Sequence, residues 1–531
     1  MATNRLFAFN NGPAIGDALQ YGNLSISDYP ISGYRWWPGP DEDLGYIIAH
    51  DDTNPNMRTE GSRSATVSTN SVGFWRSAKT SEAFLIMSND LFNLGYATAS
   101  AAAYWLTANG YWTSYTPQEA FISKSFIGGG SFSTYNGSSA NGFVKLNTDG
   151  TIDNTFSVGA GFDQDAIRTI SVQNDGKILV GGIFTSYNGE QTESIVRLNG
   201  DGTLDNTFNP PITLNVESII SIKVQPDGKI LVGGSFNFYY PDIYDANKIQ
   251  IKSITRLNSD GTLDITFAQN FEAYEQTLLN NNPPKSNGVV YDISLRPDGK
   301  IIAIGLQGKL ENYTPDIGIL NSDGSIDNST TTKIYPTEGY IFTTALQPDG
   351  KILMGGAFVT YGSGSPGVFY NRNRLVRLNS DLTLDDTFYT GATESNPTDY
   401  YYTYGSTSHG FNYTVQKVIV QYDGKILVGG GFVTYKGVTS SGIIRLNSDG
   451  SIDNNFNIGT GFARTGFNQG EVYDLKMQDD GKIIAVGYFN SYNGTSCNGI
   501  ARLNSDGSFD NTFTIGTGIN FTTGYPPQAI A

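Results

Sequence analysis

Histidine is scarce among the residues that could support acid–base or nucleophilic chemistry. The sequence holds only His50 and His409, which are far apart in the chain. Imidazole is the commonest general base and the usual activator of nucleophilic side chains, so there is little material for either mechanism. The sequence also lacks a Gly-x-Ser-x-Gly elbow, a His-Glu-x-x-His motif and a Walker loop. We therefore expect no catalytic residues and no enzymatic activity.

Acidic residues are the other candidates for chemistry. His50 is followed by Asp51 and Asp52, a cluster that could bind a metal ion, although a solvated loop explains it more simply. Recurrent loops such as "NSDGSID" are superficially like calcium loops but lack the alternating carboxylates and final Glu of an EF-hand. Aspartate and asparagine side chains also bond turn amides, which is a structural role. No carboxylate pair stands out for glycoside hydrolysis, and we predict no metal and no cofactor.

Composition excludes several classes of protein. The net charge is −17 and no Lys/Arg stripe appears, which disfavours nucleic acid as a partner. No run of eighteen apolar residues predicts a membrane span. The first residues, "MATNRLFAFNNG", do not resemble a Sec signal, so we expect assembly in the cytoplasm. Cys497 is the single cysteine, which rules out an intrachain disulfide, and we expect it to be a small buried side chain.

Two phrases recur along most of the chain. The first, "QPDGKILVGGSF" from Gln225, has relatives from Gln173, Gln347 and Gln421. The second, "RLNSDGSIDNNF" from Arg445, occurs in seven copies spaced by about 60 residues. Its asparagine marks the copies at Asn147, Asn199, Asn258, Asn321, Asn379, Asn447 and Asn504. The first repeat is truncated and the fourth is degenerate, with Ile319 and Thr330 in place of a basic residue and Phe.

Each repeat reads as four short antiparallel strands. Asp-Gly between apolar runs predicts tight hairpins of type I′, and a looser Tyr-Asn-Gly turn joins the two hairpins. The Gly-Gly pair within the second strand indicates close approach of another backbone. Seven such units without helical periodicity predict a closed seven-bladed β-propeller. An open β-solenoid is the alternative architecture.

The two phrases together resemble the delta-60 repeat, a bacterial and phage β-propeller family. The resemblance covers residues 124–531 and implies the fold without implying an activity. We accordingly assign residues 123–531 to a propeller domain. Four-stranded blades with tight Asp-Gly turns are expected on one face and longer connections on the other.

Residues 1–122 have a different composition and are assigned to a small α+β domain. All five tryptophans lie there, and "ATASAAAYWLTANGYW" predicts a helix from Ala97 to Asn109 that ends at Gly110. The phrases "RWWPGPDEDLGYIIAHD" and "WLTANGYWTSYTP" resemble an N-terminal module of tail-associated structural proteins from tailed bacteriophages. That resemblance implies docking to other virion proteins. Trp36 and Trp37 are the candidate docking edge, with burial in the domain's own core as the alternative.

Length variation indicates where recognition would occur. The connections at 239–250, 361–373, 268–288 and 389–413 are enlarged, and all of them fall at one end of the predicted sheets. Long loops on one face of a rigid scaffold are usual places for binding, although neutral drift explains them too. Their tyrosines offer large contact area at low entropic cost. The candidate binding residues are Tyr239, Tyr240, Tyr400, Tyr401, Tyr402 and Tyr404.

Two functional classes remain from the sequence. The first is a non-enzymatic structural protein of a tailed-phage virion, within a multi-subunit assembly, whose propeller is a spacer or contacts a host receptor or glycan. The second is a bacterial surface or secreted adhesin. The residues after Phe513 have the right length to supply the missing inner strand of the first repeat, with Gln528–Ala531 beside "SFIGGGSF". The segment "PQEAFIS" at 117–123 is the rival for that position.

Overall fold

The structure is a computed structural model. It describes residues 5–8, 72–76, 83–87, 125–163, 167–173, 175–192, 194–211, 216–240, 248–271, 288–305, 317–327, 334–336, 339–358, 360–363, 368–371, 373–388, 410–421, 423–467, 469–478, 480–520 and 527–531. The chain divides into two compact units, 1–123 and 124–531, which are treated separately below.

The first unit contains one small antiparallel sheet among its described residues. Its strand order is β1-β3-β2, formed by β1 (Arg5–Ala8), β3 (Ala83–Met87) and β2 (Val72–Arg76). The apolar phrase "EAFLIM" therefore supplies the central strand, β3, as its composition predicts. The expected helix at Ala97–Asn109 and the tryptophans Trp36 and Trp37 lie outside the described residues.

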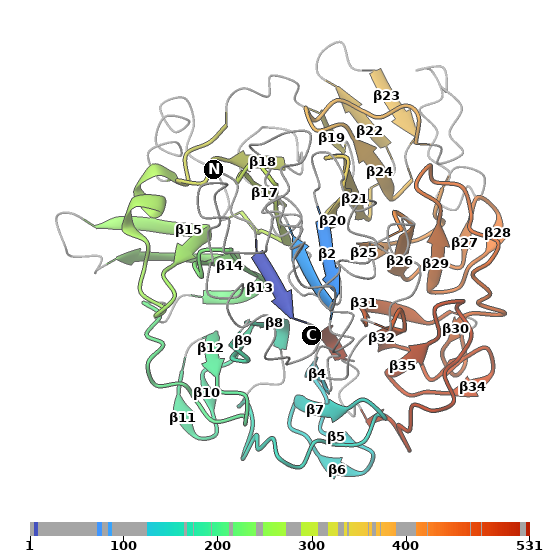
Figure 1. Cartoon of the computed structure of the whole chain (residues 1–531), viewed down its shortest axis with the longest axis horizontal. Helices are drawn as coiled ribbons and strands as arrows, with labels where there is room; N and C mark the ends of the chain where they lie inside the picture. Colours follow the sequence, from blue (N-terminus) through green and yellow to red (C-terminus); the bar gives the residue numbers. More distant parts are fainter. Residues whose placement is uncertain are drawn as a thin grey trace, which may run out of the picture. The chain divides into compact units, whose positions relative to one another are not determined.

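The second unit carries one three-stranded antiparallel sheet for each of the seven repeats, here called blades one to seven (Figure 1). In each blade the inner strand is followed by a central and an outer strand. The inner strands are β37 (Pro527–Ile530), β8 (Ile167–Val172), β13 (Val216–Val224), β16 (Asp292–Leu295), β20 (Ile341–Leu346), β25 (Val415–Val420) and β31 (Glu471–Met477). The central strands are β4 (Ser125–Gly130), β9 (Ile178–Gly182), β14 (Ile230–Tyr240), β17 (Ile301–Ile304), β21 (Ile352–Gly356), β26 (Ile426–Gly430) and β32 (Ile483–Tyr488). The outer strands are β7 (Phe143–Asn147), β12 (Ile195–Leu198), β15 (Ile249–Leu257), β18 (Ile317–Leu320), β24 (Leu375–Leu378), β29 (Ile443–Leu446) and β35 (Ile500–Leu503).

The expected fourth strand of each repeat is reduced to a single bridge in the described residues. Leu198 bridges Leu204 in blade two and Leu446 bridges Ile452 in blade six, with equivalent bridges in the other blades. After this bridge the chain turns away, because the next aspartate side chain bonds inward to basic residues instead of extending the ladder. In blade three, residues 265–271 are helical at this point.

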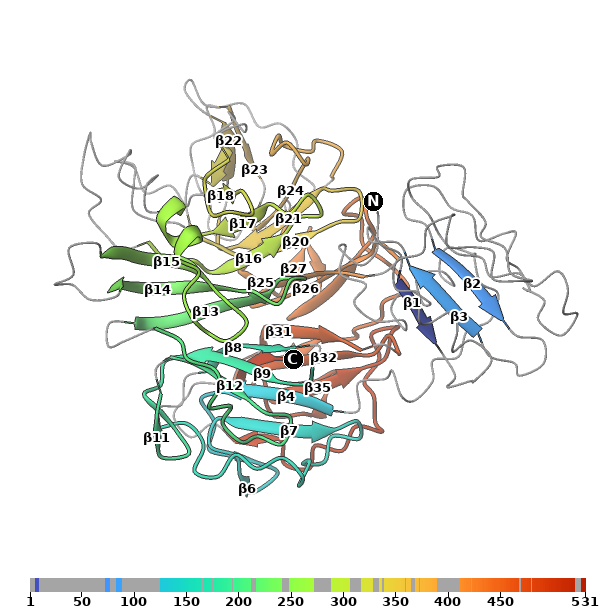
Figure 2. The ribbon, with the colours of Figure 1, turned by 60° about the vertical axis from the view of Figure 1, so that its left-hand side comes forward.

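The hydrophobic core lies between neighbouring blades. Ile127 and Phe143 of blade one pack in the same buried cluster as Ile167 and Ile178 of blade two. The first five residues of β9 and β26, "ILVGG", are all buried, and the same apolar part of the other central strands is buried too. A fully buried strand needs apolar side chains on both faces, which explains why this phrase is apolar without alternation. Figure 2 shows the strands of successive blades side by side.

The Gly-Gly pair marks close approach, as the sequence predicts. A Cβ atom at Gly181 would lie 2.6 Å from Ile219 of blade three, and one at Gly430 would lie 2.1 Å from the carbonyl oxygen of Thr414. The first glycine therefore lets the next blade approach. The second accommodates the bulged backbone of its own inner strand, where the register shifts between Val415 and Lys417.

The assignment of turn types from the sequence is wrong. At the Asp-Gly turns only the glycine has positive φ, for example 84° at Gly176, and Gly176 donates to the carbonyl of Gln173 across 2.9 Å. This pattern is a type I turn followed by a left-handed glycine, so it does not need the two positive φ values of type I′. The Tyr-Asn-Gly turns do have them, with φ of 48° at Asn136 and 77° at Gly137.

The Tyr-Asn-Gly turns, and the equivalent Tyr-Lys-Gly turn at 435–437, form small hairpins that bind the preceding blade. They consist of β5 (Thr134–Tyr135) with β6 (Ser138–Ser139), β10 (Ser186–Tyr187) with β11 (Glu190–Gln191), β27 (Thr434–Tyr435) with β28 (Val438–Thr439), and β33 (Ser491–Tyr492) with β34 (Thr495–Ser496). Strands β36 (Ile519–Asn520) and β30 (Phe462–Ala463), which follow blades seven and six, pair with β5 and β33 respectively. The tyrosine hydroxyl donates to the next Asp-Gly turn, as from Tyr187 to Gly202 across 2.6 Å.

Strands extend into two of the enlarged connections. Tyr239 and Tyr240 belong to β14 and pair with Gln250 and Ile249 of β15, so both described ends of the expected loop at 239–250 are strand. In the expected loop at 361–373, β22 (Thr360–Ser363) and β23 (Val368–Asn371) form a sheet with β19 (Ile334–Pro336). Main-chain ladders satisfy donors and acceptors that a loop would leave to water.

The last strand closes the repeat region, as predicted. β37 pairs with one edge of β4, and β7 occupies the other edge. The rival segment 117–123 is therefore not the partner of β4, because both edges of that strand are filled. A bulge between Pro527 and Ala529 reproduces the irregularity seen in the other inner strands. None of the described residues forms a helix long and apolar enough to cross a membrane.

Candidate functional site

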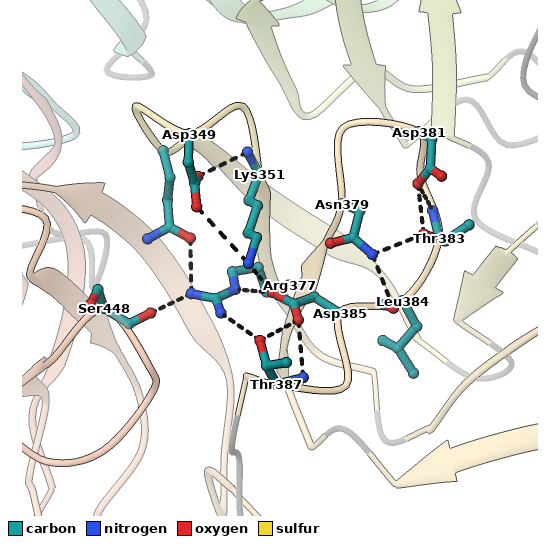
Figure 3. Close-up of polar contacts among 11 residues, drawn as sticks. Asp349, Lys351, Arg377, Asn379, Asp381, Thr383, Leu384, Asp385, Thr387 and Ser448 are labelled. Carbon is teal, nitrogen blue, oxygen red and sulfur yellow. Dashed lines mark hydrogen bonds and ion pairs between the residues drawn. The ribbon is translucent and has the colours of Figure 1, made fainter.

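Each repeat carries an ionic network around one buried or partly buried aspartate. In blade five the carboxylate of Asp385 lies 2.7 Å from Nε of Arg377 and 2.9 Å from Nζ of Lys351 (Figure 3). Its other oxygen accepts from the main-chain N–H of Thr387 at 2.9 Å. The Arg377 guanidinium also stacks on the ring of Phe388, with 4.5 Å to the centroid. Phe388 is the last residue of the second phrase. The network therefore combines the lysine of the first phrase with the arginine, aspartate and phenylalanine of the second.

The network holds its aspartate in the charged form. Burial opposes ionisation of Asp385, but the hydrogen bonds from Thr387 and Lys351 and the charge of Arg377 lower its pKa well below the ordinary value. The pKa values of Asp205 and Asp510 are lowered in the same way in their own blades. These carboxylates have their oxygens occupied by fixed donors, so they do not offer a free base or a metal ligand.

A cationic side chain from each blade also reaches the outer turn of the next blade. The acceptors are main-chain carbonyls, which do not titrate, so ionisation of an acceptor cannot break these hydrogen bonds. The pairs are Lys145 to Gly200, Arg197 to Ser259, Arg256 to Ser322, Arg296 to Ser380, Arg377 to Ser448, Arg445 to Ser505 and Arg502 to Thr148. The last pair joins blade seven to blade one, so the series returns to its start.

The degenerate fourth repeat keeps this contact by a different route. Ile319 replaces the arginine of the second phrase and is buried among apolar neighbours. Arg296, from the end of the inner strand, instead donates to the carbonyl of Ser380 across 2.7 Å. The buried partner carboxylate, Asp327, is held by Lys300 at 2.7 Å. Blade four therefore lacks the repeat's arginine but keeps a hydrogen bond to the next blade.

The inner strands carry a second set of polar contacts. Nζ of Lys417 in blade six lies 2.8 Å from the Asp474 carboxylate of blade seven. The other oxygen of Asp474 accepts from the main-chain N–H of Ile530 at 3.0 Å. Burial opposes the charge on Lys417, but Asp474 and Asp292 outweigh it and raise the pKa of Lys417. Arg168 of blade two donates to Gln528 on the other side of β37.

A third cluster differs because part of it faces solvent. Phe467 and Tyr413 are 60% and 50% exposed, among the largest exposures of any described apolar side chain. The guanidinium of Arg464 lies between two rings, 4.1 Å from the centroids of both Phe467 and Tyr488. We call Tyr413, Arg464, Phe467, Glu471, Tyr473 and Tyr488 the aromatic cluster. It sits where the inner strand of blade seven begins.

Hydrogen bonds fix the aromatic cluster in place. Tyr473 donates to the Glu471 carboxylate across 2.8 Å. Burial, followed by this bond to Glu471, raises the pKa of Tyr473, so its hydroxyl stays protonated. Phe467 donates its N–H to the carbonyl of Arg464 at 2.8 Å, which closes a turn around Gly466 at φ 80°. The arrangement presents flat rings and polar groups on a rigid support.

The residues predicted as sites are not brought together by the described structure. Tyr239 and Tyr240 are partly buried in the β14–β15 hairpin, where Lys248 stacks over Tyr239 at 5.5 Å. Tyr400, Tyr401, Tyr402, Tyr404, Trp36 and Trp37 lie outside the described residues, as do His50 and His409. Cys497 is buried, as predicted, and burial raises the pKa of its thiol. Among the described residues no three His, Cys, Asp or Glu side chains gather as metal ligands.

The sequence analysis overlooked the aromatic cluster. Its signal is an insertion: "GFARTGFNQGEVYDL" has eight residues between Phe462 and Glu471, whereas Phe162 is followed after four residues by Ile167. A second feature, a cavity of about 480 Å³, lies beside the outer strand of blade two. It is lined by Arg197 and Asp205, whose polar groups are already bound to each other, and by Gln191 and Phe208.

The comparisons with known proteins agree with this architecture. The family model for a β-propeller domain of unknown function matches six segments, 127–156, 173–208, 225–267, 347–388, 421–456 and 478–513. The degenerate fourth repeat is absent from these matches. No curated protein matches the chain significantly.

Several solved structures resemble the chain weakly. A protein from Lactobacillus plantarum is 11% identical, with a TM-score of 0.36 over 77% of this chain and 98% of that one. The YCF48 protein bound to a D1 peptide is 12% identical, with a TM-score of 0.32 over 68% and 86%. Virginiamycin B lyase from Staphylococcus aureus is 12% identical, with a TM-score of 0.31 over 66% and 85%. On its matched segments, the chain carries repeats similar to those of this β-propeller domain family, which agrees with its series of antiparallel sheets.

Proposed function

We propose that the chain is a non-enzymatic structural protein of a tailed-phage virion. Its N-terminal unit docks to the tail, and residues 123–531 form a rigid seven-bladed ring of delta-60-like repeats. The ring is a spacer or presents a surface that recognises the host. The observation that carries the rigid-scaffold part is the series of basic side chains joining each blade to the next, including Arg502 to Thr148.

The distribution of charged groups supports a scaffold role. The charged residues that recur in the repeats, such as Lys351, Arg377 and Asp385, bind one another, so their polar groups are already paired. Enzymes keep at least one perturbed titratable group accessible to substrate. Here the strongly shifted carboxylates are internal ties between strands. Recognition by the accessible aromatic cluster is consistent with the same scaffold.

The virion assignment depends on the N-terminal phrases and has a direct test. Particles released from lysed cells of the source would be purified on a density gradient and analysed by mass spectrometry. We expect peptides of this chain in the particle fraction at constant stoichiometry with a tail protein. Peptides found only in the cell envelope or culture medium would instead favour the adhesin alternative.

The non-enzymatic assignment is tested separately. Purified full-length chain would be incubated with panels of glycan, ester and peptide substrates. We expect no turnover above a heat-denatured control. Hydrolysis that disappears when one carboxylate near Phe467, such as Glu471, is replaced by Gln would overturn this assignment.

A further inference from the structure

The aromatic cluster has features of a ligand site that its structural role does not require. A structural aromatic residue is normally covered, yet Phe467 and Tyr413 are exposed over half or more of their accessible surface. Exposed apolar groups rimmed by polar residues mark interaction sites more often than chance surface does. The turn 464–467 holds these groups in place through main-chain bonds, including one from Thr465 to the side chain of Asn490.

The groups form one continuous surface. Tyr488 is the main-chain partner of Glu471, and Tyr473 bonds to the same carboxylate. A Cβ atom at Gly431 would lie 3.0 Å from both Glu471 and Tyr413. Glycine at position 431 therefore lets the Tyr413 ring and the Glu471 carboxylate approach each other closely. Gln469 donates to the carbonyl of Gly431 and ties the segment before β31 to the end of β26.

The charges in the cluster define the class of ligand. Arg464 and Glu471 carry opposite charges, so the surface has no net charge to attract an ionic ligand. A flat ring favours a flat apolar face, and the polar atoms beside it favour a ligand with hydroxyl groups. A pyranose has both: one face of C–H groups and a rim of hydroxyls that can bind a carboxylate and a guanidinium at adjacent positions.

We propose that the aromatic cluster binds a neutral sugar unit of a surface glycan. The ring of Phe467 or Tyr413 packs against the sugar face, while Glu471 accepts and Arg464 donates hydrogen bonds to its hydroxyls. The inference deepens the host-recognition role proposed above and rests on it. It also accounts for the insertion at 463–470, which adds an aromatic turn ahead of the inner strand of blade seven.

The test uses full-length chain on an array of neutral oligosaccharides of glucose, galactose, mannose and N-acetylglucosamine, with sialylated oligosaccharides as acidic probes. We expect binding to at least one neutral probe and weaker binding to its acidic counterpart. Phe467→Ala and Tyr413→Ala should each reduce the affinity at least about tenfold, as truncation of an aromatic anchor does. Val438→Ala is the matched control, because Val438 is also 50% exposed but lies on the β28 hairpin.

The outcomes separate this inference from the proposed function. Absence of neutral-sugar binding, or binding unchanged in Phe467→Ala with an unaltered melting temperature, overturns the sugar site. Loss of cell attachment in Phe467→Ala without any glycan binding would mean that the surface recognises protein, which also overturns it. Sugar binding by a chain that is absent from purified virions would retain the site and reject the virion role.

Discussion

Ile127 and Ala531 exchange both of their main-chain hydrogen bonds, each with a donor–acceptor distance of 3.0 Å. These residues lie at the two ends of the repeat region, so the pair fastens the C-terminal end of the chain to blade one. The side chain of Asp474 supports the closure by accepting from Ile530. Closure removes the exposed inner edge that β4 would otherwise present.

Removal of the closing strand should destabilise the whole propeller. Deleting residues 527–531 exposes an edge of β4, removes the buried side chain of Ile530 and leaves the Asp474 oxygen without its main-chain donor. We expect a loss of more than about 2 kcal/mol in unfolding free energy, since burial of one Ile side chain alone contributes about 1.5–3 kcal/mol. Denaturant titration followed by circular dichroism measures the loss. Asn520→Ala, an exposed change nearby, is the control, and an unchanged midpoint in the deletion variant would show that β37 is dispensable.

Adjacent glycines in β4 should respond differently to the same change. A Cβ atom at Gly129 would lie 2.6 Å from Ile167 of blade two, whereas one at Gly128 meets only Val144 at 3.7 Å. Gly129→Ala should therefore cost about 1–3 kcal/mol by overpacking the blade interface. Gly128→Ala should be neutral or slightly stabilising, because alanine restricts the unfolded chain. Equal melting temperatures for the two variants would contradict close packing between blades, and Gly181→Val and Gly430→Val extend the test to blades two and six.

The ionic networks predict loss of stability in acid. Asp205, Asp385 and Asp510 have pKa values lowered by folding, so they bind protons more weakly in the folded state. Their contribution is complete above the ordinary carboxyl pKa of about 3.9 and is lost as the pH falls toward the folded pKa values. We expect the denaturation midpoint to be nearly constant from neutral pH to about pH 5 and to fall steeply below pH 4.

A single substitution separates the network from general acid effects. Asp385→Ala leaves Arg377 and Lys351 without their shared carboxylate and should cost about 3–5 kcal/mol at neutral pH. The difference between this variant and the parent should shrink as the pH falls below 4, because the parent then protonates Asp385. Glu190→Gln, at an exposed site outside the network, is the control. A difference that is independent of pH would reject the ionic explanation.

Cys497 should serve as a reporter of unfolding. Its side chain is fully buried and burial raises the pKa of the thiol, so the reactive thiolate is suppressed in the folded chain. Iodoacetamide at pH 8 should not label the native protein, and labelling should become complete in denaturant. Intact-mass spectrometry measures the fraction labelled. Rapid labelling of the native protein, at the rate of free cysteine, would contradict the buried position.

The sequence determined the architecture because each repeat contains its own local instructions. The apolar phrase "KILVGG" specifies a buried strand, the glycine of Asp-Gly permits the left-handed turn residue, and the spacing sets one blade for about 60 residues. The closing strand was predictable too, since Gln528–Ala531 falls at the distance from Phe513 that the other repeats show. These features depend on local backbone preferences and on segment lengths, and both can be derived from residue types and positions alone.

Tertiary structure alone decided which side chains meet across blades. Arg296 takes over the contact that Ile319 cannot make, although Arg296 follows β16, Ile319 lies in β18, and their spacing carries no such signal. Tyr239 and Tyr240 read as loop residues but extend a ladder, because β15 is long enough to pair with them. The aromatic cluster joins residues from 413 to 488 through contacts around blade seven and through the approach of Gln469 and Glu471 to Gly431 of blade six. Such contacts depend on how neighbouring sheets are placed relative to each other. That placement is set by burial of apolar side chains between blades, which is a property of the folded chain and not of any single repeat.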